Sequence, residues 1–144
     1  MDKNYKSSFQ FNDYKLQHVE FTYNPDCSSQ DSIELTFAIN VSVSIKDVND
    51  AIITLEAIIF DDAKKNNYPF TLKVAISGHF SIDGEQLFTS DEFLAYCKLN
   101  GVTVMFPFLR SVIADITKAA NIDTLILPLM NISSMLDEKN TIDK

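Results

Sequence analysis

Only a few side chains in this sequence could take part in covalent chemistry, and their spacing favours structural roles. The histidines, His18 and His79, have no cysteine or carboxylate at the spacing of a metal site. The carboxylate pairs at residues 61–62 and 91–92 each lie beside an expected turn or helix start, where they satisfy local backbone groups. We therefore expect no catalytic residues, no metal site and no cofactor.

The remaining reactive groups are also isolated from one another. Arg110 is the only arginine and falls within an expected helix, where a neighbouring carboxylate is its expected partner. Cys27 and Cys97 lie far apart without a CxxC motif, which is typical of reduced thiols in the cytoplasm. The sequence contains no Gly-rich phosphate loop, nucleophile elbow or dinucleotide fingerprint. A binding protein is thus favoured over an enzyme.

Composition limits the class of protein and its partners. A chain of 144 residues favours one domain spanning 1–144, with short flexible ends at about 1–7 and 140–144. The net charge of −8, with no basic cluster larger than Lys64-Lys65, makes nucleic acid an unsuitable partner. The N-terminus lacks the apolar region of a signal peptide, and no apolar run has the length of a membrane span. We expect a cytoplasmic protein that does not insert into membranes.

One apolar segment has features that suit binding. Residues 125–132 follow the longest expected helix and fit neither the helical nor the strand period, and Pro128 prevents a helix from continuing through them. The segment could fill the rim of the core or a subunit interface, or it could stay exposed as a binding surface. Met130 and Met135 add adaptable apolar surface, which suits the recognition of varied partners. The sequence leaves both alternatives open.

Strands in the first half of the chain would form the base on which this segment is placed. Residues 33–45, 52–60 and 70–82 alternate between apolar and polar side chains or are rich in β-branched residues. In residues 9–23 the apolar positions switch parity, which predicts β-bulges in the first strand. Short polar connections favour an antiparallel meander of these strands, because parallel pairing would need crossover helices.

Helices in the second half would cover one face of that sheet. A first helical segment is expected to break near Gly101, and a longer helix to start around Phe106 with Pro107 in its first turn. Ser133 or Ser134 would cap a short last helix. The expected fold class is α+β: a four-stranded antiparallel sheet with a long C-terminal helix on one face, a proline-containing crossover loop and a short last helix.

Several motifs resemble the SecB family. Residues 78–82 (GHFSI), 94–97 (LAYC) and 105–110 (MFPFLR) are similar to the family's G-x-F-x-I, L-x-x-Y-C and L-F-P-Y-x-R elements. Residues 125–132 (LILPLMNI) are similar to its L-x-L-x-P-[IV]-N-F segment, with Leu129 where many members have a second proline. The start of the chain, from residue 9, resembles the family's first strand.

This resemblance implies a chaperone that holds unfolded polypeptide or preprotein clients in a hydrophobic groove without ATP, for protein export. It also implies a homotetramer, a dimer of dimers with the long helices between the sheets. The implied oligomer interface comprises Met105, Phe108, Leu109, Val112 and Ile116. The implied peptide-binding groove and crossover loop comprise Leu125, Ile126, Leu127, Pro128, Leu129, Met130, Ile132, Met135 and Leu136.

The wet face of the sheet docks the translocase motor SecA in export-dedicated family members. The matching residues here would be His18, Glu20, Thr22, Glu34, Thr71 and Lys73. His18, Thr22 and Lys73 stand where many members carry acidic side chains, so the resemblance does not establish that SecA docks. Other SecB-like chaperones serve toxin–antitoxin pairs, which makes an antitoxin the alternative client. A non-catalytic ligand-binding or scaffold domain is a further alternative.

Overall fold

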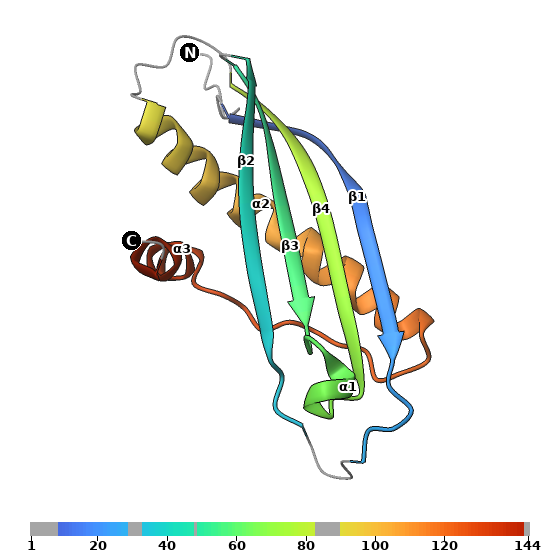
Figure 1. Ribbon diagram of the computed structural model, residues 1–144. Coiled ribbons are helices and arrows are strands. Elements are labelled where there is room, and N and C mark those ends of the chain that lie inside the picture. The colour runs from blue at the N-terminus through green and yellow to red at the C-terminus, as the bar shows by residue number, and fades with distance from the viewer. Residues whose placement is uncertain (1–8, 29–32, 48, 83–89, 143–144) are drawn as a thin grey trace.

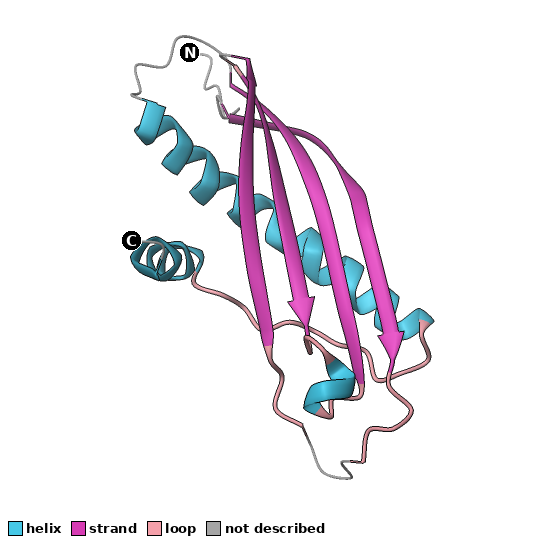
Figure 2. Ribbon diagram, in the orientation of Figure 1, coloured by secondary structure: helices cyan, strands magenta, loops and turns pink. Residues whose placement is uncertain are grey.

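The computed structural model describes residues 9–28, 33–47, 49–82 and 90–142 of the 144-residue chain. Within these residues, four antiparallel strands form one sheet, and a long helix crosses one face of it (Figures 1 and 2). The strands are β1 (Phe9–Tyr23), β2 (Phe37–Asp47), β3 (Asp50–Ile59) and β4 (Phe70–Ile82). The helices are α1 (Ala63–Asn66), α2 (Ser90–Ala119) and α3 (Ile132–Ile142). The predicted α+β class is confirmed.

The strand order departs from the predicted meander at one position. β2, β3 and β4 follow one another as antiparallel neighbours, but β1 pairs with β4, which gives the order β1-β4-β3-β2. The connection from β1 to β2 therefore joins opposite edges of the sheet. The meander was wrong for β1 because the length of a connection does not specify the edge at which a strand pairs.

The predicted bulges in β1 are confirmed. Register shifts relative to β4 lie between Phe11 and Asp13 and between Leu16 and His18, where the apolar positions change parity. Each shift adds a residue to β1, so the apolar side chains on either side of it return to the same face. The residues of β1 that pair with helix-facing positions of β4 are Phe9, Phe11, Tyr14, Leu16, Val19, Phe21 and Tyr23.

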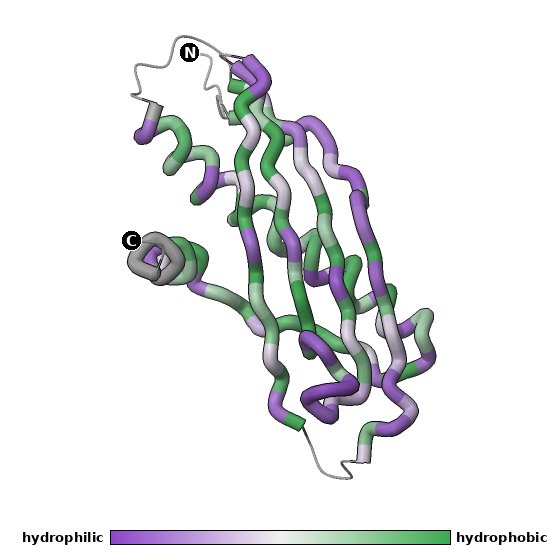
Figure 3. The backbone as a smooth tube through the Cα atoms, viewed as in Figure 1, coloured by the Kyte–Doolittle hydropathy of each residue, from purple (hydrophilic) through white to green (hydrophobic). Residues whose placement is uncertain are grey.

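The two faces of the sheet differ in burial, as the alternating hydropathy along the strands suggests (Figure 3). Ile53 and Leu55 of β3 and Ile76 of β4 have no exposed surface and pack with α2 in the hydrophobic core. Thr54 and Ser77 lie between these positions on the opposite face, where their hydroxyl oxygens are 2.8 Å apart. One face is therefore dry and covered, and the other carries polar groups.

α2 is one continuous helix, whereas the sequence predicted a break near Gly101 and a new start at Phe106. Gly101 lies against the sheet, because a Cβ atom built on it would overlap Ile53 Cδ1. Gly78 of β4 makes a similar contact, since its Cβ would stand 2.7 Å from Met105 Sδ. Glycine at these positions allows the helix to approach the sheet closely.

Pro107 lies inside α2, on the exposed side of the helix. It cannot donate a hydrogen bond to the carbonyl of Thr103, one turn earlier. Thr103 is exposed as well, so water can satisfy that carbonyl. The helix therefore continues through a proline that sequence rules place at a helix start.

Asparagine residues mark the helix ends around residues 120–131. Asn121, just after α2, has a φ of 61°, in the left-handed region where helices commonly end. Asn131 caps α3, because its Oδ1 accepts a hydrogen bond of 3.0 Å from the backbone N–H of Ser134. The predicted serine caps were therefore wrong, and Ser134 is a donor to the cap.

The flexible ends expected at about 1–7 and 140–144 stay a prediction. Residues 140–142 form the last part of α3, which continues to Ile142. Residues 1–7 and 143–144 lie outside the described residues.

By length and composition, the α2 segment Asp91–Ala119 could also cross a membrane, which the sequence prediction did not anticipate. Packing on the sheet explains part of the apolar character of α2. Cys97, Met105, Leu109 and Ile113 have no exposed surface and belong to the hydrophobic core. α2 is accordingly the core helix of this fold.

Replacing Gly101 with alanine tests the close packing of α2 on the sheet. Alanine is normally the better helix former by about 1 kcal/mol, but its methyl group would collide with Ile53, which is fully buried. We expect Gly101→Ala to lower the free energy of unfolding by about 1–3 kcal/mol, measured by urea denaturation. Ile53→Val removes the colliding Cδ1 atom, so the double variant should lose less stability than the sum of the single variants. Strictly additive losses would contradict this contact.

Candidate functional site

We call residues 120–131, between α2 and α3, the crossover loop. It turns back at the end of α2 and runs along the helix-covered side of the sheet to α3 (Figure 1). The crossover loop beyond its first turn has no regular secondary structure. Its backbone groups therefore need hydrogen-bond partners from other elements or from water.

Arg110 and Thr117 of α2 supply hydrogen bonds to the crossover loop. Arg110 Nε donates to the carbonyl oxygen of Leu127 at 2.8 Å. The backbone N–H of Leu125 donates to Thr117 Oγ1 at 2.9 Å, and this hydroxyl donates back to the carbonyl oxygen of Ile113, 3.0 Å away. The sequence predicted a carboxylate partner for Arg110, whereas its Nε binds the backbone of the loop.

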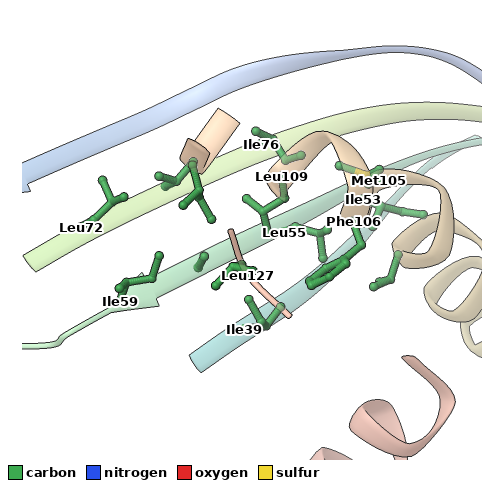
Figure 4. Close-up of a cluster of buried hydrophobic side chains, with 14 of the residues drawn as sticks. Ile39, Ile53, Leu55, Ile59, Leu72, Ile76, Met105, Phe106, Leu109 and Leu127 are labelled. Atoms are coloured by element: carbon green, nitrogen blue, oxygen red, sulfur yellow. The ribbon is translucent and has the colours of Figure 1, made fainter. Parts of the chain in front are cut away.

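Side chains of the crossover loop differ in burial. Leu127 is fully buried in the same apolar cluster as Leu55 and Ile59 of β3 (Figure 4). It therefore anchors the loop and is a core residue, not one that another molecule can contact. Ile126, in contrast, is 58% exposed, and Leu129 is 84% exposed.

The other residues predicted to line a groove lie on both sides of this anchor. Pro128 is exposed at the surface of the loop. Half-buried positions are Leu125, Met130, Ile132, Met135 and Leu136. Among these, Met130, Ile132 and Met135 pack against the edge of the hydrophobic core while keeping part of their surface open. The structure thus brings the predicted residues together, but only some of them are accessible.

A depression of about 160 Å³ separates the N-terminal half of α2 from α3. Its lining residues are Ala95, Lys98, Leu99, Ser133, Leu136 and Asp137. Leu99 is 41% exposed and gives this depression an apolar side. Of the lining residues, the sequence prediction included only Leu136. The α2 residues were missed because that part of the helix was assigned to a separate, shorter segment.

The residues predicted for an oligomer interface divide into two groups. Met105 and Leu109 are fully buried against the sheet of their own chain, so they cannot contact a second subunit in this conformation. Phe108 is 37% exposed, and Val112 and Ile116 are half-buried. The prediction was wrong for the first group because helical periodicity identifies an apolar side without showing what covers it.

Exposed apolar residues at the β1 edge were not predicted. Leu16, Val19 and Tyr23 lie on the helix-side face of β1 and are 50%, 39% and 59% exposed. The ring of Phe108 lies 4.8 Å from that of Tyr14, between centroids, on the same face of β1. We call Leu16, Val19, Tyr23 and Phe108 the edge patch. The sequence signal for the three β1 residues was the pair of parity switches, which returns their side chains to one face.

The predicted docking residues lie mainly on the polar face of the sheet. His18, Glu20 and Thr22 of β1 pair with Ala75, Lys73 and Thr71 of β4, and the Lys73 Nζ–Glu20 Oε2 distance is 3.7 Å. The Thr71 hydroxyl is occupied locally, because it donates to the carbonyl oxygen of Phe60 at 2.7 Å. Glu34 is exposed in the coil before β2 and does not belong to the sheet.

A polar cleft of about 620 Å³ adjoins these residues, where the end of β1 meets α1. Glu20, Asp26, Asp61 and Asp62 contribute carboxylates to its lining, and Lys64 is among its cations. Thr71 Oγ1 also accepts a hydrogen bond of 2.9 Å from the backbone N–H of Ala63. The cleft is thus lined mainly by polar and charged residues, and it is framed by a tightly bonded connection between β3 and β4.

Groups that could perform covalent chemistry are dispersed over the described residues. No three His, Cys, Asp or Glu side chains among them are grouped so as to hold a metal ion. Burial raises the pKa of the Cys97 thiol, which disfavours the reactive thiolate. His79 Nε2 lies 3.2 Å from Asp50 Oδ1 on the open face of the sheet.

Comparison with known proteins identifies the family. The family model for preprotein translocase subunit SecB matches residues 8–141, nearly the whole chain. The chain belongs to the SecB family. Protein-export protein SecB of Anaplasma phagocytophilum is 27% identical over 70 residues, which cover 49% of this chain and 44% of that protein. An uncharacterised protein of Methanocaldococcus jannaschii is 29% identical over 133 residues, covering 91% of this chain and 84% of that protein.

A solved structure shares the fold. It contains a SecB-like chaperone of Mycobacterium tuberculosis in complex with an antitoxin peptide. The TM-score is 0.63 at 16% sequence identity, and the match covers 85% of this chain and 88% of that chain. The two proteins therefore share a fold.

The SecB-like motif MFPFLR has a structural explanation in this chain. Met105 and Phe106 are buried against the sheet, and Pro107 and Phe108 reach the surface. Arg110 reaches from the same helix to the backbone of the crossover loop. The motif thus combines core packing, helix surface and loop attachment within about two helical turns.

Truncation of Leu127 and of Leu129 to alanine should distinguish the buried anchor of the crossover loop from its exposed surface. Leu127→Ala removes a fully buried side chain, so we expect it to lower the free energy of unfolding by about 2–5 kcal/mol. Leu129→Ala makes the same chemical change at an exposed position and should change stability by less than about 0.5 kcal/mol. Urea denaturation followed by circular dichroism measures both, and equal losses would show that the loop is not anchored as described.

Proposed function

We propose that this SecB-family protein is an ATP-independent chaperone that holds unfolded polypeptide, using the exposed apolar side chains of the crossover loop. The observation that carries the proposal is the exposure of Ile126 and Leu129 on a loop whose backbone is bonded to α2. Large apolar side chains that remain exposed on a held segment are typical of protein-binding surfaces. Half-buried Met130 and Met135 extend this surface with flexible side chains that adapt to varied clients.

The energetics of such a surface suit reversible holding. A client segment that buries roughly 600 Å² of apolar surface gains on the order of 15 kcal/mol. Loss of translational freedom and ordering of the segment cost roughly 4–15 kcal/mol. Each site would thus bind weakly to moderately and with little sequence preference, and several sites on one oligomer would hold a long client more strongly. Binding of this kind requires no covalent chemistry and no cofactor.

Assembly into a homotetramer is part of the proposal. The edge patch leaves Leu16, Val19, Tyr23 and Phe108 open in the single chain, and apolar surface of this kind favours association. We propose a dimer of dimers in the cytoplasm, in which each chain contributes one chaperone domain. Neighbouring subunits would then place several crossover loops on one particle.

The client could belong to either of two classes. Export precursors are favoured by the family description, preprotein translocase subunit SecB. An antitoxin is the second candidate, since the structurally similar chaperone of Mycobacterium tuberculosis binds an antitoxin peptide. For export, we propose that the polar face of the sheet docks SecA through the region of His18, Glu20, Lys73 and the adjoining cleft.

A small-molecule-binding domain is a weaker alternative. It would need a closed apolar pocket between the sheet and the helix. Met105 is fully buried and Phe106 is 5% exposed in that region, where both fill the space between α2 and the strands. The side chains that are free to bind lie on the outside of this layer.

Charge substitutions on the crossover loop test the proposal. The double variant Ile126→Asp/Leu129→Asp places charges on exposed apolar positions, so it should stay folded but lose apolar contact with a client. We expect affinity for a reduced and alkylated protein, which cannot refold, to fall about tenfold or more, since 1.4 kcal/mol corresponds to a factor of ten. The same variant should no longer suppress aggregation of a heat-denatured protein.

The matched control adds equal charge to the other face of the sheet. Ala38 and Ser42 of β2 are exposed and lie away from the crossover loop, on the polar face. Ala38→Asp/Ser42→Asp should leave client affinity and aggregation suppression unchanged. If the loop variant and the control behave alike while both remain folded, the crossover loop is not the client-binding surface.

A further inference from the structure

Two hydrogen bonds attach the backbone of the crossover loop to side chains of α2. The Leu125 N–H is bonded to Thr117 Oγ1, and the Leu127 carbonyl is bonded to Arg110 Nε. These bonds hold backbone groups on either side of Ile126, at distances of 2.9 Å and 2.8 Å. The intervening residue therefore has little freedom to rotate about the loop axis.

This attachment determines which side chains face outward. In an extended chain, successive side chains point in opposite directions. With the backbone held at Leu125 and Leu127 and the Leu127 side chain buried, the side chain of Ile126 must point away from the core. The alternation ends after Leu127, because Pro128 and Leu129 are both exposed.

We propose that Thr117 and Arg110 are positioning residues that set client affinity by holding Ile126 outward. The inference rests on the proposed function, because it concerns the same surface. A loop that is already ordered loses less conformational entropy when a client binds. Loosening it should therefore weaken binding even though no client-contacting side chain has changed.

A substitution of Thr117 tests the positioning of the loop without changing a side chain that a client could contact. Its side chain has no exposed surface, so a client cannot touch it. Its hydroxyl donates to α2 and accepts from the loop, and only the second of these bonds connects two elements. If removal of this hydroxyl changes client affinity, the change must therefore come from an altered crossover loop and not from a lost contact with the client.

Arg110 requires a test that separates geometry from charge. The Nε–H donates sideways from the guanidinium group to Leu127, and lysine has no equivalent donor at that point of its side chain. Arg110→Lys keeps the positive charge but loses this bond. If Arg110 acted by attracting acidic clients, the lysine variant would bind as well as the original protein.

The experiment compares Thr117→Val, Thr117→Ser and Arg110→Lys in the full-length protein. Thr117→Val keeps the shape of the side chain without the hydroxyl, whereas Thr117→Ser keeps the hydroxyl without the methyl group. Thr103→Val is the matched control, because the exposed Thr103 hydroxyl also donates within α2, to the Leu99 carbonyl at 2.6 Å. Hydrogen–deuterium exchange of residues 122–131 reports loop order, and fluorescence anisotropy of a labelled, reduced and alkylated protein reports client affinity.

We expect Thr117→Val and Arg110→Lys to speed exchange in residues 122–131 and to raise the client Kd about three- to tenfold, the effect of one side chain's ordering cost. Thr117→Ser and Thr103→Val should leave the client Kd unchanged. Faster loop exchange with an unchanged Kd in Thr117→Val would overturn the inference, as would unchanged exchange in that variant. Failure of the unsubstituted protein to bind the labelled client would instead overturn the proposed function.

Discussion

The close approach of α2 to the sheet is the constraint on which the rest of this structure depends. At Gly101 and Gly78 there is no room for a Cβ atom, because Ile53 and Met105 occupy that space. The helix can therefore lie directly on β3 and β4 and exclude water from the centre of one sheet face. A bulkier residue at Gly101 would have to displace Ile53, and one at Gly78 would have to displace the end of the Met105 side chain.

This packing also determines where the crossover loop can run. α2 covers the sheet diagonally, so the returning chain must pass over the part of the same face that the helix leaves open (Figure 1). Leu127 fills that remaining space, and polar side chains of α2 bind the loop backbone around it. The crossover loop is thus partly core and partly surface. Its sequence allowed it either to fill the rim of the core or a subunit interface, or to stay exposed as a binding surface. Buried anchoring and exposed apolar residues occur in the same short stretch.

The surfaces left open by this arrangement have different chemistry. The helix side presents apolar groups at the crossover loop and at the edge patch, whereas the opposite face presents hydroxyl groups and mixed charges such as Lys73 and Glu20. An acidic chain with a net charge of −8 can keep such apolar surface soluble because like charges oppose non-specific association. A chaperone needs this combination, since it must expose apolar surface without aggregating itself.

The sequence by itself determined the strands, the bulges of β1, the apolar side of the long helix and the family, because these depend on local periodicity and short motifs. It did not determine that β1 pairs with β4, that α2 continues through Gly101 and Pro107, or that Leu127 is buried while Leu129 is exposed. Those features depend on partners distant in sequence: Ile53 faces Gly101, and Arg110 holds Leu127. Only the tertiary structure brings these groups together, so it alone decides which apolar residues are enclosed and which remain available.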